Sequence, residues 1–106
     1  MLLSEILETA KDLIADAKYI CEREPSHQYY ADKGIKPEQY LPNFEAWKKS
    51  QKRLIASQWQ SDVLDATDYA EGTERQWDLF WEQIDELRKD PYIRDCFKEV
   101  DDNGEA

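Results

Sequence analysis

The stretch that decides the fold reads K-R-L-I-A-S-Q-W-Q-S-D-V-L-D-A-T at residues 52–67 and, after a short polar break, T-E-R-Q-W-D-L-F-W-E-Q-I-D-E-L-R-K-D-P at residues 73–91. In both parts the apolar residues recur three or four positions apart, which is the spacing of one face of an α-helix. The two parts also hold three of the four tryptophans, Trp59, Trp77 and Trp81. The stretch therefore predicts two amphipathic helices with large aromatic side chains.

The boundaries of these helices follow from capping residues. We expect the first helix to begin at Asn43, whose side chain can cap it, and to reach about Thr67. Its apolar stripe is Phe44, Trp47, Leu54, Ile55, Trp59, Val63 and Ala66, with Gln51 among them. We expect the second helix from Thr73 to Arg88, because Thr73 and Gln76 form a capping-box pattern. Its stripe is Trp77, Phe80, Trp81, Ile84 and Leu87.

Two further helices are expected toward the chain ends. Ser4 can cap an amphipathic helix that runs to about Glu22. Its apolar residues are Leu3, Ile6, Leu7, Ala10, Leu13, Ile14, Ala17, Ile20 and Cys21. Asp90-Pro91 resembles a cap and first helical position, which predicts a short helix after it. The inward side of that helix is expected to carry Tyr92, Ile93, Cys96, Phe97 and Val100.

Residues 23–43 interrupt the helical pattern. Pro25, Gly34, Pro37 and Pro42 forbid one long helix across this segment. Its tyrosines and aliphatic residues can still pack, so we expect an ordered connector with short helical turns. Gly34 can close one turn and Pro37 can open the next.

The sequence thus predicts an all-α fold, a small bundle of three longer helices plus a short C-terminal helix, with a long ordered connector. We expect residues 1–100 to form a single helical domain and residues 101–106 an acidic, flexible tail. A chain of 106 residues can bury about 65% of its unfolded surface, so one core without covalent staples is feasible.

The two cysteines do not indicate a metal site. Cys21 and Cys96 are far apart in sequence, and His27 is the chain's one histidine, so neither a zinc site nor a disulfide framework is predicted. We expect two buried free thiols, with a single Cys21–Cys96 bridge as the open alternative. The start of the chain shows no basic leader and no membrane-length apolar run, so we expect a cytoplasmic protein that does not enter a membrane.

The net charge of −10 is unevenly distributed. Residues 1–24 carry −3, residues 25–70 are balanced and residues 71–106 carry −7. A negative field of this kind repels phosphate backbones, which disfavours nucleic-acid binding, and it steers basic proteins toward the chain. The simpler interpretation is that the charge provides solubility.

The acidic side chains of the second helix are candidates for chemistry or for binding. Asp78, Glu82, Asp85 and Glu86 are helical neighbours, but their alternation with basic residues is equally typical of an ordinary exposed face. We therefore expect no enzyme activity and no metal or cofactor. His27 is expected to be a surface or hydrogen-bonded residue rather than a ligand or base.

The tryptophans have two interpretations, because they can fill the core or contact a partner. Leu79, Phe80 and Trp81 are consecutive and cover more than one stripe of their helix, which favours some exposed apolar surface. A second protein could cover that surface, and a homodimer is one version of this. The predicted protein-binding residues are Trp59, Trp77, Phe80, Trp81, Asp78, Glu82, Asp85 and Glu86.

Residues 52–91 resemble the C-terminal region of small bacteriophage tail assembly chaperones. In that family a helix of the form R-x-R-L-L-A-x-x-D-W leads into a D-A turn and, after a spacer, W-x-x-Y-R-x-x-L-R-D-x-P follows. The matching residues here are Lys52-Arg53-Leu54-Ile55-Ala56, Trp59, Asp65-Ala66, Trp77, Phe80, Leu87-Arg88 and Asp90-Pro91. Gln58 replaces the family's aspartate, Trp81 occupies the position of its arginine, and Leu87-Arg88 falls three residues later than the family's motif places it.

The resemblance implies a non-enzymatic role in which the protein transiently binds a tail or tail-fibre protein during virion assembly. The alternative is an acidic inhibitor or DNA mimic that blocks a basic groove of a host defence or nucleic-acid-processing protein, as anti-CRISPR and anti-restriction proteins do. The surplus charge after residue 70 motivates this alternative.

Overall fold

The computed structural model describes the backbone of residues 1–104 and the side chains of residues 1–98. Every regular element in this part of the chain is helical, which confirms the all-α prediction. The elements are α1 (Leu3–Glu22), α2 (His27–Asp32), α3 (Pro37–Gln58), the π-helix η1 (Trp59–Leu64), the 3₁₀-helix η2 (Asp65–Tyr69), α4 (Glu74–Arg88) and α5 (Pro91–Gly104).

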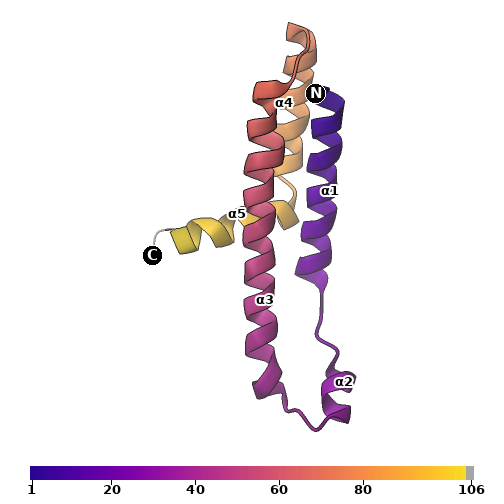
Figure 1. Ribbon diagram of the computed structural model, residues 1–106, viewed down its shortest axis with the longest axis vertical. Coiled ribbons are helices and arrows are strands. Elements are labelled where there is room, and N and C mark those ends of the chain that lie inside the picture. The colour runs from indigo at the N-terminus through magenta and orange to yellow at the C-terminus, as the bar shows by residue number, and fades with distance from the viewer. Residues whose placement is uncertain (105–106) are drawn as a thin grey trace.

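The helices form an elongated molecule of 60 × 30 × 21 Å (Figure 1). The elements η1 and η2 continue α3 without a break, and α1 lies alongside this long helical column. α4 packs against α1, and α5 crosses α3 near its middle and points sideways (Figure 1). α2 and the first turns of α3 extend beyond the end of α1.

The centre of the fold is a regular apolar stripe on α1. Its buried residues are Ile6, Ala10, Leu13, Ala17 and Ile20, which alternate four and three positions apart. This spacing is the heptad pattern that keeps one side of a helix facing its neighbours over several turns. The two alanines are completely buried, so neighbouring helices can approach α1 closely at those positions.

The stripe on α1 completes one core with residues from the other long elements. The remaining members of this core are Ile55, Trp59, Val63, Ala66, Phe80, Ile84, Ile93 and Cys96. Leu54 was expected on the same stripe of α3, but this prediction is wrong, because its side chain is 55% exposed. Trp47, which was expected on this stripe as well, is also exposed.

The start of α3 differs from the prediction. The helix begins at Pro37 rather than at Asn43, because the side chain of Gln39 accepts a hydrogen bond of 2.8 Å from the backbone N–H of Lys36. Pro37 has the fixed φ that a first helical residue requires. Pro42 lies inside the second turn, where its missing N–H removes one helical hydrogen bond without ending the helix. Part of the expected connector is therefore helix.

Three other boundaries agree closely with the sequence. α1 starts at Leu3, close to the predicted start, but its N-cap position is Leu2, so the prediction that Ser4 caps the helix is wrong. Gly34 has a φ of +73°, as expected of a residue that closes a helical turn. At the start of α5 the carboxylate of Asp90 accepts a hydrogen bond of 3.0 Å from the N–H of Tyr92. α5 is longer than expected and includes residues 101–104 of the predicted tail, while residues 105–106 lie outside the described residues.

The capping box of α4 is present as predicted. The hydroxyl of Thr73 accepts a hydrogen bond of 3.2 Å from the N–H of Gln76, and the side chain of Gln76 accepts one of 2.8 Å from the N–H of Thr73. These two bonds satisfy N–H groups that would otherwise have no partner at the helix start. They fix where α4 begins.

Replacing Thr73 by Ala is expected to lower the free energy of unfolding by about 1 kcal/mol, because the N–H of Gln76 loses its acceptor. Ser26→Ala is the matched control, since Ser26 precedes α2 but makes no capping hydrogen bond. Urea denaturation followed by circular dichroism measures both variants. Equal stability of the two variants would contradict the assigned role of the Thr73 cap.

Candidate protein-binding surface

Two of the predicted binding residues are core residues instead. The side chain of Trp59 is 0% exposed and that of Phe80 is 1% exposed. Trp59 is the first residue of η1, and its ring meets that of Phe97 edge-on with a centroid distance of 5.9 Å. The prediction that Trp59 and Phe80 form a surface is therefore wrong, because the packing of η1 and α4 against α1 encloses both.

The other two aromatic residues remain accessible on one flank of α4. Trp81 is 40% exposed and Trp77 is half-buried. Their rings stack with a centroid distance of 6.3 Å and an interplanar angle of 24°. We call this pair the tryptophan flank. The buried ring of Phe80 packs against Trp81 with a centroid distance of 5.1 Å and an interplanar angle of 70°.

The four predicted acidic residues of the site are all exposed on α4. Asp78, Glu82, Asp85 and Glu86 lie on the side of the helix turned away from the core. Glu86 forms an ion pair of 3.1 Å with Lys89, which is also exposed. Among the described residues, no group of three or more His, Cys, Asp or Glu side chains is placed to hold a metal ion. The acids thus form a solvated negative face beside the tryptophan flank.

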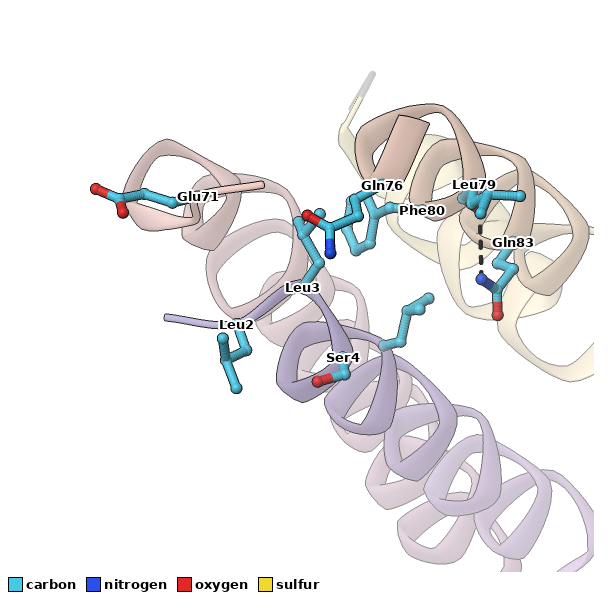
Figure 2. Close-up of a pocket in the computed structure, with 9 residues that line it drawn as sticks. Leu2, Leu3, Ser4, Glu71, Gln76, Leu79, Phe80 and Gln83 are labelled. Atoms are coloured by element: carbon cyan, nitrogen blue, oxygen red, sulfur yellow. Dashed lines mark hydrogen bonds between the residues drawn. The ribbon is translucent and has the colours of Figure 1, made fainter. Parts of the chain in front are cut away.

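A groove on the opposite flank of α4 was not identified from the sequence. Two cavities of about 320 Å³ and 390 Å³ adjoin one another where α1 and α4 meet, and they share Leu79 and Gln83. The first is lined by Leu2, Leu3, Ser4, Leu7, Glu71, Gln76, Leu79, Phe80 and Gln83 (Figure 2). The second is lined by Lys11, Leu79, Glu82, Gln83, Glu86 and Leu87. We call the two together the α1–α4 groove.

The sequence contained one signal for this groove. Leu79 extends the apolar run beyond the core stripe of α4, and its side chain is indeed 48% exposed. Leu3 and Leu7, which the periodicity assigned to the core side of α1, are only half-buried and line the groove. Spacing alone cannot show that α4 leaves these leucines partly uncovered.

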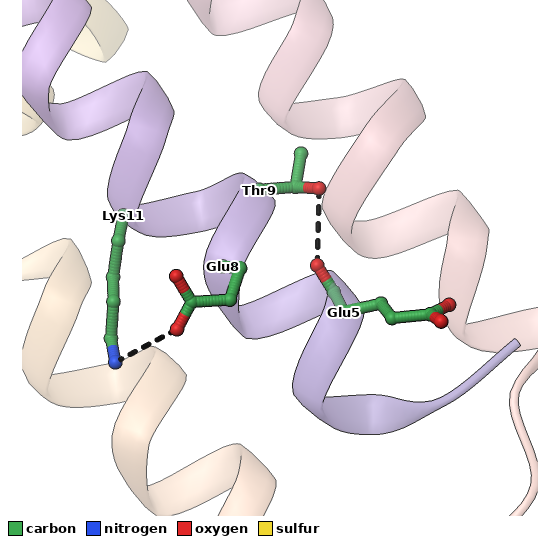
Figure 3. Close-up of polar contacts among 4 residues, drawn as sticks. All are labelled: Glu5, Glu8, Thr9 and Lys11. Atoms are coloured by element: carbon green, nitrogen blue, oxygen red, sulfur yellow. Dashed lines mark hydrogen bonds and ion pairs between the residues drawn. The ribbon is translucent and has the colours of Figure 1, made fainter.

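The polar contacts near the groove are short-range. Lys11 lies 3.6 Å from the carboxylate of Glu8 on the preceding turn of α1 (Figure 3). The hydroxyl of Thr9 donates a hydrogen bond of 3.1 Å to the carbonyl oxygen of Glu5. Both residues of the ion pair are largely exposed, so the pair contributes little to stability and leaves Lys11 free to rearrange.

A second aromatic group lies at the far end of the molecule, on α2 and the start of α3. Tyr30 and Tyr40 stack with a centroid distance of 4.0 Å, and the hydroxyl of Tyr40 hydrogen-bonds Nδ1 of His27. His27 is therefore a hydrogen-bonded surface residue, as expected. A cavity of about 400 Å³ beside this stack extends to Phe44 and Trp47. This group packs α2 against the start of α3.

The two thiols are free, but only one is fully enclosed. Cys96 is buried in the core and Cys21 is half-buried at the end of α1. Burial raises the pKa of Cys96 to about 12, with a smaller contribution from the neighbouring Cys21. Burial also raises the pKa of Cys21, although Lys52 acts in the opposite direction. Near neutral pH both groups are protonated and therefore weak nucleophiles.

Comparisons of the chain with protein-family models, with curated proteins and with solved structures found no match. Among the described helices, none has an apolar segment of the length that a membrane span requires. The resemblance to tail assembly chaperones thus rests on the sequence motif of residues 52–91.

Acrylamide quenching of tryptophan fluorescence is expected to distinguish the exposed indole of Trp81 from the buried indole of Trp59. Trp81→Phe should reduce the fraction of emission that acrylamide quenches, because this indole is partly open to solvent. Trp59→Phe should instead remove protected emission and raise the quenchable fraction. The two variants are compared by their Stern–Volmer plots. The assignment of Trp59 to the core is contradicted if its removal lowers the quenchable fraction.

Thiol labelling at pH 8 is expected to be slow at Cys21 and slower still at Cys96, since a raised pKa leaves little thiolate. The single variants Cys21→Ser and Cys96→Ser isolate the two rates with an absorbance-based disulfide reagent. In concentrated urea both variants should react at similar rates, which provides the control. A fast reaction at Cys96 in the folded protein would show that its side of the core opens readily.

Proposed function

We propose that this protein is a non-enzymatic protein-binding protein that acts as a phage tail assembly chaperone. The observation that carries the proposal is the apolar surface that α4 leaves exposed on both flanks, with Leu79 48% exposed on one side and Trp81 40% exposed on the other. Large exposed apolar side chains grouped in this way are typical of surfaces that another protein covers.

The charge of the protein suits this role. The acidic face of α4 lies between its two apolar flanks. A partner bound on either flank would therefore lie beside charged side chains that stay hydrated. A chaperone must cover an apolar region of its client without precipitating, and a net charge of −10 supports solubility of the complex.

The side chains best suited to covalent or acid–base chemistry are engaged in structural contacts, which supports a non-enzymatic role. Cys96 is enclosed in the core and its raised pKa keeps it protonated. The imidazole of His27 is hydrogen-bonded to the hydroxyl of Tyr40. The carboxylates of α4 are exposed to solvent, and that of Glu86 is paired with Lys89.

One observation favours a second candidate function, an acidic inhibitor that mimics DNA. Asp78, Glu82 and Asp85 follow one another along the exposed side of α4 and form no ion pair with the described side chains. An array of this kind can occupy a basic groove. The two candidates differ in salt dependence, because charge-driven binding weakens as salt screens it while apolar contacts persist.

The test is co-expression with phage tail and tail-fibre proteins, followed by purification at low and at high salt. A tail protein is expected to co-purify at both salt concentrations. The double variant Leu79→Ser/Trp81→Ser should recover about tenfold less of it, in line with the loss of two interface anchors.

The matched control is Tyr19→Ser/Leu54→Ser, because these side chains are 57% and 55% exposed but lie on α1 and α3. This variant should retain the tail protein. Recovery of only nucleic-acid-processing proteins, and only at low salt, would refute the chaperone proposal and favour the acidic inhibitor.

A further inference from the structure

We propose that the α1–α4 groove binds one amphipathic helix of the partner, with leucine-like residues on its inner side and lysine or arginine along its edges. This inference rests on the proposed protein-binding function and names the chemistry of the segment that is bound. It also assigns the groove, rather than the tryptophan flank, as the primary contact.

The shape of the groove fits a helix. Its lining advances along both helices together, from Leu3 and Gln76 at one end to Lys11 and Leu87 at the other. α1 and α4 therefore run parallel and form two walls. The eleven residue steps from Gln76 to Leu87 correspond to about 16 Å of helix. A partner helix of about three turns would fill this length, and its axis could lie between the walls as a third packed helix.

The lining provides anchor points for apolar side chains. Leu2 is 61% exposed and Leu79 is 48% exposed, while Leu3, Leu7 and Leu87 are half-buried and Phe80 closes the floor. The groove consists of two adjoining cavities that meet at Leu79. An amphipathic helix presents anchors at positions i, i+3 or i+4, and i+7. Two successive anchors of one helix would therefore occupy the two cavities.

The charged residues that line the groove favour basic residues along the edges of the bound helix. Three glutamates and one lysine line it, namely Glu71, Glu82, Glu86 and Lys11. Lys11 is already paired with Glu8, and Glu86 with Lys89, whereas Glu71 and Glu82 form no ion pair with any described side chain. Basic residues on the partner would complement Glu82, whereas the carboxylate of Glu71 points away from the other lining side chains (Figure 2). A second copy of this chain, with a net charge of −10, is a poorer match.

The experiment that tests this proposal is an NMR titration of ¹⁵N-labelled protein with three synthetic helices of about 14 residues. All three carry leucines at the same helical spacing and differ only in their edge residues, which are Lys, Gln or Glu. The Lys peptide is expected to bind about tenfold more tightly than the Glu peptide. Its amide shifts should concentrate at residues 2–11 and 76–87 and leave α2 unchanged.

Two matched pairs of variants locate the binding. Leu79→Ser should weaken binding of the Lys peptide about tenfold, whereas Leu54→Ser, at an equally exposed leucine outside the groove, should change it less than about twofold. Glu82→Gln should reduce the preference for Lys over Glu edges. Asp85→Asn, on the same helix but outside the groove lining, should leave that preference unchanged.

Each other outcome overturns the groove proposal in a distinguishable way. Binding that is lost in Trp81→Ser but kept in Leu79→Ser would place the helix on the tryptophan flank and leave the protein-binding function intact. Dimers in light scattering that Leu79→Ser converts to monomers would identify a second copy as the occupant. Equal affinity for all three peptides would show that the charges of the groove do not favour a helix with basic edges. If no peptide binds while a tail protein co-purifies, only the groove inference fails.

Discussion

The packing of α1 is the constraint on which the rest of the structure depends. Its stripe of two isoleucines, a leucine and two alanines is in contact with α3, η1, η2, α4 and α5, so every longer element is fixed relative to this one helix. The fully buried Ala10 and Ala17 allow this, because larger side chains would push the neighbouring helices away. A polar residue on this stripe would separate the elements that form both candidate surfaces.

The same arrangement explains why apolar surface is left over. The backbone of α4 packs mainly against α1, and bulky side chains such as Phe80 and Trp77 fill the space toward the α3–η1 column. The two flanks of α4 on either side of this buried face remain open. One carries Trp81 over Trp77, and the other carries Leu79 over the leucines of α1. The groove and the tryptophan flank thus both result from the way α4 packs against α1.

The features that could be predicted from the sequence are those set by interactions between residues close together in the chain. Thr73 and Gln76 are three residues apart, so their reciprocal hydrogen bonds could be recognised before the fold was known. The start of α3 was missed because Lys36 and Gln39 do not form a common capping pattern, and Pro42 suggested a break. The burial of Trp59 could not be deduced, because an amphipathic stripe is the same whether a helix faces a core or a partner.

Stability and binding are expected to be coupled in α4. α4 is held by its capping box, by its packing against α1, and by Phe80 and Ile84, which are buried in the shared core. A helix bound in the α1–α4 groove would touch both walls and would bind only when α4 is docked. Ligand that binds only the docked form stabilises it by mass action. A helix bound in the groove would therefore also fix the positions of the acidic face and the tryptophan flank. Binding at any one surface of α4 would in this way favour binding at the others.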